Sequence, residues 1–346
     1  MRVAVLDDYQ RVAHRFADWA SLGAEVDFLD RPLPDDDAVA AALAGYDVVV
    51  AMRERTPFTA ARLARLPDLR LLVTTGRQNA AIDLDAARER GVVVCGTESP
   101  TNATPELTWA LILAVLRHVP AEDRAMRDGG WQHTVGGDLE GRRLGIVGLG
   151  RLGTRVARVG QAFGMDVVAW SQRLDPATAA EAGVRAVAKD ELFATSDVVT
   201  VHYKLSDRSR GIVGADDLAR MKPGAVLVNT SRGPLVDTGA LLAALHDGRL
   251  GGAGIDVYDV EPLPADHPLR SAPRTVLTPH LGYVTEATYR TFYGQAVEDV
   301  AAWAAGGAGA GADVGRQTDM PMLSKDDVVE NTVKNVPAMK SRMNTT

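Results

Sequence analysis

The sequence predicts an α/β protein of two domains, each built on a parallel β-sheet that helices cover on both faces. Its 346 residues correspond to about two domains at roughly 150 residues each. Short β-branched runs alternate with helical stretches along most of the chain, which is typical of parallel sheets. One run leads into a glycine-rich turn that opens a helix. The apolar share of 46% and the charged share of 24% are those of a folded protein and exclude a disordered one.

The first series of predicted strands belongs to a small flavodoxin-like domain. Helical spacing lies between the strands at Ala38–Leu43 and at Leu84–Arg90, where Gly91 ends the helix. Strand, helix and strand in repetition predict parallel pairing. The strands are expected at Val3–Leu6, Glu25–Phe28, Val48–Ala51, Leu71–Thr74 and Val92–Cys95.

A second and larger series of strands follows a long helix predicted at Glu106–Arg117. Six strands separated by helical stretches fit a doubly wound Rossmann sheet made of two nucleotide-binding halves. A last helix is predicted at Glu286–Ala304. The strands are expected at Arg143–Val147, Asp166–Trp170, Val198–His202, Ala225–Asn229, Ala253–Val257 and Thr275–Thr278.

The glycine-rich turn predicts a dinucleotide-binding site. Gly148, Gly150 and Gly153 directly follow a predicted strand and open a helix. In that context glycines allow a tight turn, close approach of the backbone to a pyrophosphate, and close packing of helix on strand. The helix N-terminus offers free N–H groups and a positive dipole to the phosphates. We expect cofactor contacts from the glycines and from Arg151 and Leu152; the alternative is a structural turn without a ligand.

The end of the following strand indicates which dinucleotide binds. An acid that bonds the ribose 2′-hydroxyl is usual there, but this chain has Ser171, with Arg173 two residues on. Without the carboxylate a 2′-phosphate is not repelled, and a hydroxyl with a guanidinium could bind it. The pattern favours NADP and leaves NAD open. The alternative for Arg173 is a solvated surface residue.

Charge and cysteine content exclude several function classes. The chain has 38 Lys and Arg against 45 Asp and Glu, a net charge of −7, which disfavours a nucleic-acid binder because such proteins need a basic surface. The single cysteine, Cys95, leaves no disulfide and no thiolate set for zinc, and we expect no metal.

The longest apolar run, Leu107–Leu116, is well short of the roughly 20 residues of a membrane span. We find no signal-peptide pattern and expect a cytoplasmic protein.

Three polar residues stand at or just beyond predicted strand ends in the second series, where doubly wound sheets bind ligands. They are Arg232, Glu261 and His280, and each has a glycine or proline beside it. This placement indicates loops that carry a site on a rigid scaffold. The alternative is a capping arginine, a surface glutamate and a strand-end histidine that never meet.

These stretches together resemble the D-isomer-specific 2-hydroxyacid dehydrogenases. The resemblance covers about residues 2–303 and ends before the C-terminal stretch. Several motifs in order are far more specific than the glycine turn alone. They are GLGRLG at 148–153, VNTSRG at 228–233, DVYDVEP at 256–262 and TPHLG at 278–282, with support from TPEL at 104–107.

The resemblance implies a role for each residue of the trio, and the reduction of a 2-oxo acid requires the same chemistry. His280 would give a proton to the carbonyl oxygen, because histidine titrates near neutral pH. Glu261 would orient the imidazole and favour its protonated form. Arg232 would grip the substrate carboxylate as a planar bidentate donor. Among cofactor contacts, Asp256 would help to orient the nicotinamide, and Thr230 is also expected.

Substrate contacts are expected from the first domain. The resemblance implies that the turn at residues 75–79 offers backbone N–H groups to the substrate carboxylate, with Arg77 and Gln78 as candidate side chains. Arg77 could equally be a surface residue. Arg53 and Arg55 follow the third predicted strand and could meet a substrate phosphate or remain solvated.

One loop departs from the pattern of the relatives. They commonly carry His-x-Pro-Leu after the fourth cofactor-domain strand, where this chain has His202-Tyr-Lys204-Leu. Lys204 therefore replaces the proline of a cofactor-contacting loop. We interpret His202 as structural.

The motif order predicts that the two domains are interleaved: a Rossmann cofactor domain, residues 99–284, is inserted into a flavodoxin-like substrate domain. The substrate domain comprises residues 1–98 and a returning helix at 285–303. Residues 304–312 contain only Ala and Gly. We expect residues 304–346 to form a linker and a weakly ordered tail, with a docking helix at 326–333 as the alternative.

The leading hypothesis is an NAD(P)-dependent reductase of a small 2-oxo acid, of the glyoxylate or hydroxypyruvate type. A phosphoglycerate dehydrogenase is the nearest enzymatic alternative, kept open by Arg53 and Arg55, although the tail is too short for a regulatory domain. A corepressor-like dinucleotide sensor with the same fold is the alternative from another class. The resemblance also implies a homodimer formed through residues 109–131, whose leucines Leu111, Leu113 and Leu116 could instead be buried within one subunit.

Overall fold

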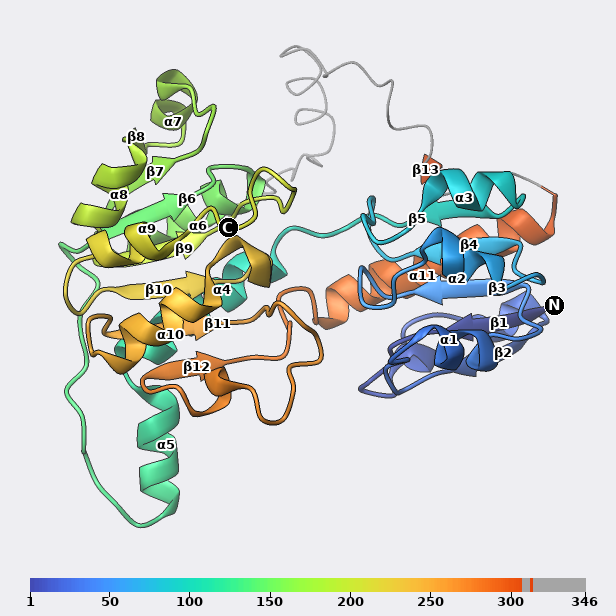
Figure 1. The fold of residues 1–346 in the computed structure, drawn as a ribbon, viewed down its shortest axis with the longest axis horizontal. Helices are drawn as coiled ribbons and strands as arrows, with labels where there is room; N and C mark the ends of the chain where they lie inside the picture. The colour runs from blue at the N-terminus through green and yellow to red at the C-terminus, as the bar shows by residue number, and fades with distance from the viewer. Residues whose placement is uncertain (307–311, 314–346) are drawn as a thin grey trace, which may run out of the picture.

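The computed structural model describes residues 1–306 and 312–313, and it contains two sheets in two lobes (Figure 1). Strands of the first sheet lie in the order β2-β1-β3-β4-β5, and all of these pair in parallel. The second sheet has the order β12-β11-β10-β9-β6-β7-β8, also parallel. These are the flavodoxin-like and the Rossmann orders, the latter with a seventh strand. The predicted fold class is confirmed.

The predicted strands all form, with ends that differ by at most two residues. The first sheet contains β1 (Arg2–Val5), β2 (Glu25–Phe28), β3 (Val48–Ala51), β4 (Leu71–Thr74) and β5 (Val93–Gly96). The second contains β6 (Arg143–Val147), β7 (Asp166–Trp170), β8 (Arg185–Ala186), β9 (Val198–Val201), β10 (Val226–Asn229), β11 (Gly252–Ile255) and β12 (Thr275–Leu277). β8 was not predicted, because two residues at a sheet edge carry no periodic pattern.

Helices cover both sheets and connect the two lobes. The α-helices are α1 (Asp36–Ala42), α2 (Ala60–Ala64), α3 (Leu84–Glu89), α4 (Ala103–Leu116), α5 (Val119–Arg127), α6 (Arg151–Ala162), α7 (Pro176–Glu181), α8 (Lys189–Thr195), α9 (Ala215–Arg220), α10 (Thr238–His246) and α11 (Glu286–Ala304). Short 3-10 turns lie at Ala13–Arg15, Trp19–Leu22, Gly233–Leu235 and Pro268–Ser271. None of the described helices has the length and apolar content to cross a membrane.

The last helix, α11, returns from the second lobe to the first (Figure 1). Its N-cap Thr285 accepts a hydrogen bond from the backbone N–H of Thr288. Phe292 and Tyr293 are buried in one apolar cluster with Val50 of β3 and Val73 of β4. A segment near residue 290 therefore completes a core that begins at β1, which agrees with an interleaved order. The boundaries of the two domains stay a prediction.

A short strand, β13 (Ala312–Asp313), pairs antiparallel with β5. No sequence pattern indicated it, since an edge strand pairs through backbone groups alone. Of the expected linker and tail, Ala304 is the last residue of α11, whereas residues 307–311 and 314–346, which include the alternative helix at 326–333, lie outside the described residues.

Candidate active site

The structure brings two of the three predicted catalytic residues into direct contact. His280 Nδ1 lies 2.6 Å from Glu261 Oε2, and the side chains are 15% and 28% exposed. The other carboxylate oxygen of Glu261 accepts the N–H of Tyr258 at 2.9 Å. Burial alone would raise the pKa of Glu261, but the hydrogen bond and charge of His280, with the Tyr258 N–H, bring the pKa below its ordinary value. Glu261 is therefore ionised at neutral pH and fixes the imidazole ring.

Asp256 builds the turn that carries His280. Its Oδ1 accepts hydrogen bonds from the Thr278 hydroxyl at 2.6 Å and from the Leu281 N–H at 2.7 Å, and its Oδ2 accepts the Gly282 N–H at 2.9 Å. His280 has a φ of 55°, a left-handed conformation that few non-glycine residues adopt. The fully buried carboxylate therefore holds this turn in place. Sequence reasoning missed this role, although an acid directly after a buried strand was a signal for it.

Arg232, the third member of the trio, is engaged by a glutamate that was not predicted. Its Nη2 donates to both carboxylate oxygens of Glu54, at 3.1 and 3.0 Å, and its Nη1 donates to the carbonyl of Ser231 at 2.7 Å. Glu54 comes from the loop after β3, whereas Arg232 follows β10. The pair therefore joins the two lobes.

The loop after β3 also brings two arginines to this region. Arg53 donates from Nη1 to the carbonyl of Thr75 at 3.1 Å. Arg55 donates from Nε to the hydroxyl of Tyr283 at 2.6 Å, and its guanidinium lies 4.7 Å from the ring centre of Tyr9. Both arginines are partly buried, so neither is simply solvated.

Tyr283 connects this loop to the histidine, because its ring stands edge-on to His280 with 5.5 Å between ring centres. Glu54 and Tyr283 are residues that sequence reasoning missed. We call the set of polar side chains that meet here the junction cluster; its members are Arg53, Glu54, Arg55, Arg232, Glu261, His280 and Tyr283.

The turn at residues 75–79 has several of its polar groups occupied. The N–H of Gly76 donates to Thr97 Oγ1 at 2.7 Å. Arg77 forms an exposed ion pair with Glu98 at 3.1 Å, which favours its surface interpretation. Gln78 accepts a hydrogen bond from Lys204 Nζ at 3.3 Å, so Lys204 reaches from the end of β9 to the predicted substrate turn.

The glycine-rich turn has the geometry that a dinucleotide requires. A Cβ on Gly148 would lie 2.4 Å from the carbonyl oxygen of His202, and a Cβ on Gly153 would lie 2.2 Å from that of Gly148. Packing within the protein thus explains why neither position can carry a side chain. A Cβ on Gly150 would meet none of the described atoms within 4 Å, so that glycine is left to be explained by a ligand. No described side chain caps the start of α6, and the residues therefore fit a bound pyrophosphate.

Other predicted cofactor residues have the following surroundings. Ser171 Oγ accepts the N–H of Leu149 at 3.0 Å, which fastens the end of β7 to the glycine turn. Arg151 and Arg173 are exposed. The buried hydroxyl of Thr230 lies 2.8 Å from that of Thr108 on α4.

His202 has the surroundings of a structural residue. Burial lowers its pKa to about 4, and its Nε2 lies 3.0 Å from Thr200 Oγ1. The ring is therefore neutral near neutral pH.

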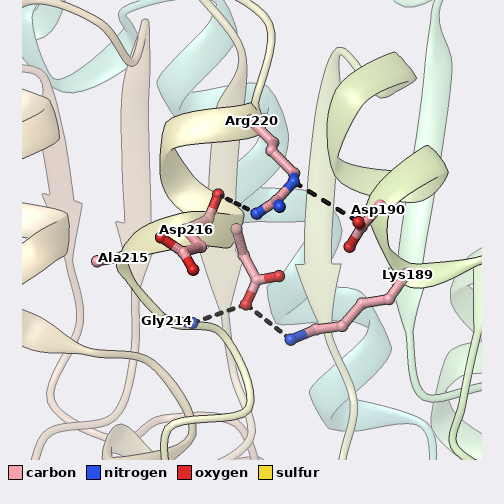
Figure 2. Close-up of a pocket in the computed structure, with 7 residues that line it drawn as sticks. Lys189, Asp190, Gly214, Ala215, Asp216 and Arg220 are labelled. Carbon is pink, nitrogen blue, oxygen red and sulfur yellow. Dashed lines mark hydrogen bonds and ion pairs between the residues drawn. The ribbon is translucent and has the colours of Figure 1, made fainter.

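A surface hollow of about 460 Å³ lies between α8 and α9, away from these residues (Figure 2). Lys189 Nζ and the N–H of Gly214 both contact Asp217 Oδ2, at 2.7 and 2.8 Å, and Arg220 lies 3.7 Å from Asp190. Lys189 is thus paired with Asp217 and Arg220 with Asp190, and none of the predicted site residues lines the hollow.

Comparison with known families shows to which family the chain belongs. The family model "D-isomer specific 2-hydroxyacid dehydrogenase, NAD binding domain" matches residues 109–282. The chain belongs to this family. It is therefore an oxidoreductase with an NAD-binding domain, as the motifs at the strand ends indicated.

Curated members of the 2-hydroxyacid dehydrogenase family are similar over most of this chain. A glyoxylate reductase of Aeropyrum pernix is 37% identical over 254 residues, which cover 70% of this chain and 76% of that protein. A D-3-phosphoglycerate dehydrogenase of Mycobacterium tuberculosis is 37% identical over 269 residues, or 77% of this chain. The aligned region spans only 51% of that longer relative.

Solved structures of the family share the fold. A phosphoglycerate oxidoreductase from Vibrio cholerae O395 superposes with a TM-score of 0.84 at 38% identity, covering 88% of this chain and 99% of that one. The apo-structure of D-lactate dehydrogenase from Escherichia coli gives a TM-score of 0.78 at 24% identity over 90% of this chain. At that identity the likeness concerns the fold alone.

Proposed function

We propose that this family member reduces a small 2-oxo acid to the D-2-hydroxy acid with NADPH or NADH. The observation that carries the proposal is the 2.6 Å contact between His280 and an ionised Glu261. A carboxylate that orients an imidazole ring and stabilises its protonated form enables the ring to act as a general acid. The similarity to a glyoxylate reductase supports a substrate of that size.

Each residue of the trio has one task in this reaction. NAD(P)H supplies the hydride when it is bound at the glycine-rich turn. His280 donates a proton from Nε2 to the carbonyl oxygen of the substrate, since Nδ1 is engaged by Glu261. Arg232 binds the substrate carboxylate through its planar guanidinium, and the same charge polarises the neighbouring carbonyl group.

Replacement of His280 tests the proposal. His280→Ala should lower kcat by about 10²- to 10⁴-fold, which is the usual contribution of a general acid. His246→Ala is the matched control, because that histidine is exposed at the end of α10. Oxidation of NADPH or NADH is followed with glyoxylate, hydroxypyruvate and pyruvate. Equal activity of His280→Ala and wild type would refute the assignment, and absence of turnover in wild type would favour a dinucleotide sensor.

We infer that the cofactor is NADP rather than NAD, because Ser171 and the exposed Arg173 stand where an acid would repel the 2′-phosphate. The same assay compares kcat/KM for NADPH and NADH. A preference for NADPH that is lost in Arg173→Ala is the expected result, and a strong preference for NADH in wild type would contradict it.

Oxidation of 3-phosphoglycerate is the second candidate function. Several relatives at 33–37% identity are named D-3-phosphoglycerate dehydrogenase, which favours it, and Arg53 and Arg55 lie in the junction cluster. This chain spans about half the length of those relatives.

A further inference from the structure

Glu54 is the anionic group in the half of the junction cluster where the substrate carboxylate is expected. It contacts Arg232 at 3.0 Å and Arg53 at 3.7 Å. The three side chains are only 19–31% exposed. Burial would raise the pKa of Glu54, but the charges of Arg232 and Arg53 outweigh it and bring the pKa below its ordinary value. A permanent negative charge therefore lies between the two guanidinium groups.

Arg53, Glu54 and Arg232 together carry enough positive charge to balance one further anion. Two guanidiniums and one carboxylate carry a net charge of one positive unit, so a single substrate carboxylate on Arg232 makes the group neutral. Arg55 does not alter this net charge, because its charge stabilises the ionised forms of Glu261 and Asp7. Its guanidinium is held by Tyr283 and Tyr9.

A second anionic group on the substrate would face a different environment. Once its carboxylate is bound by Arg232, the rest of a three- or four-carbon acid lies within a few bond lengths of Glu54, because Glu54 contacts the same guanidinium. Juxtaposed like charges in a partly buried site repel one another and disfavour binding. Arg53 and Arg55 alone would attract a phosphate, whereas Glu54 between them in sequence opposes it.

We propose that Glu54 determines substrate specificity by charge: it admits 2-oxo acids that carry one carboxylate and rejects those with a second carboxylate or a phosphate. This inference rests on the proposed function, since it takes Arg232 as the carboxylate-binding residue. It sets the protein apart from a phosphoglycerate dehydrogenase, whose substrate carries a phosphate in addition to its single carboxylate.

The test compares Glu54→Gln with wild type on two classes of substrate. The monoanions are glyoxylate and hydroxypyruvate, and the acids with a second anionic group are oxaloacetate and 3-phosphohydroxypyruvate. Glutamine keeps the size of the side chain and removes its charge. The ratio of kcat/KM for the second class to that for the first should rise about tenfold or more. Glu191→Gln, which removes the same charge from a surface ion pair with Arg185, should leave the ratio unchanged.

A purely structural role for Glu54 gives a different result. If Glu54 only ties the two lobes together through Arg232, Glu54→Gln lowers kcat/KM for all four acids by the same factor. An unchanged ratio overturns the inference while leaving the proposed reductase activity in place.

Binding measurements separate failure of this inference from failure of the proposed function. Calorimetry with oxamate, a monoanion, and tartronate, a dianion, needs no turnover. Wild type should bind oxamate more tightly than tartronate, and Glu54→Gln should narrow that difference about tenfold. Absence of a preference in wild type, or an unchanged preference in the variant, overturns the inference even if no 2-oxo acid is reduced.

Discussion

At the scale of single residues, the candidate site depends on one strained backbone position. His280 has a positive φ, and its N–H donates to the carbonyl of Asp256 at 2.7 Å. The Asp256 carboxylate takes three further donors from the same turn. Strain of this kind persists only where the surroundings fix it and is frequent at functional sites. Asp256 thus fixes the backbone of His280, and Glu261 fixes the orientation of its imidazole ring.

Glu261 gives a prediction about pH. Glu261→Gln keeps a hydrogen-bond acceptor but removes the charge that stabilises the imidazolium. We expect kcat for reduction to fall about 10- to 100-fold, and this loss should be present at every pH above the lowered pKa of Glu261, where the wild-type carboxylate is ionised. Glu261→Asp keeps the charge and should restore part of the rate. The pH–rate profiles of the three proteins provide the measurement, and superimposable profiles for wild type and Glu261→Gln would contradict the positioning role.

At this scale the sequence predicts some contacts and not others. Arg232, Glu261 and His280 could be found because each follows a strand in a recognisable motif. The contact of Glu54 with Arg232 spans 178 positions and depends on how the two lobes meet, which no local pattern encodes. From the sequence alone, a glutamate between two arginines is indistinguishable from part of a solvated, charged loop, because the partner of each charge is not known.

At the scale of elements, the turn from β6 into α6 separates the needs of packing from those of ligand binding. Gly148 has a φ of 102° and Gly153 touches the backbone of Gly148, so the fold requires both. Gly150 has an extended φ of −95° and open space where a Cβ would be. Of the three glycines, Gly150 is therefore the one whose lack of a side chain is explained by ligand binding rather than by packing.

This difference predicts opposite effects for two similar substitutions. Gly150→Ala should leave the thermal stability of the free protein nearly unchanged and weaken binding of NADPH or NADH about tenfold, because the methyl group stands where the backbone approaches the pyrophosphate. Gly148→Ala should destabilise the fold by about 1 kcal/mol or more, through both its positive φ and its clash with His202. Thermal unfolding and fluorescence titration measure the two effects. Equal cofactor affinity in Gly150→Ala and wild type would refute the proposed approach of the phosphates.

The strands themselves were predictable to within two residues, for a physical reason. Strands such as β3 and β9 are buried on both faces, so they consist of short runs of mostly β-branched residues. β8 and β13 have two residues each and form by pairing with an existing edge. Such short strands depend on their neighbours rather than on their own sequence.

At the scale of the whole molecule, the apolar residues of 109–135 divide into two groups. Leu111 and Leu116 are buried in the core of their own lobe, and the partly buried Leu113 packs against that core, so all three leucines contribute to packing within one subunit. Beyond α4, none of the described residues of α5 is buried. Trp131 and Val135 are 72% and 93% exposed. They follow α5, which extends away from the rest of its lobe (Figure 1), and we call residues 119–135 the arm.

We propose that this arm binds a second copy of the chain. Its shape is maintained without a partner, because the carboxylate of Glu122 accepts the N–H groups of His133 and Thr134 at 3.1 and 2.7 Å. An ordered arm that presents large apolar side chains is typical of a protein interface. Wild type should therefore sediment as a dimer at micromolar concentration. Trp131→Asp combined with Val135→Asp should give folded monomers, since burial of the two carboxylates at the interface would be costly.

Val135→Thr serves as the matched control for the arm, because it keeps the shape of the side chain and adds no charge. It should leave the dimer intact. Since the arm contributes no residue to the junction cluster, the monomeric variant should retain its cofactor affinity, and this distinguishes loss of the interface from loss of the fold. A wild-type protein that sediments as a monomer would contradict the proposal, and so would a double variant that remains dimeric, because the interface would then lie elsewhere on the surface.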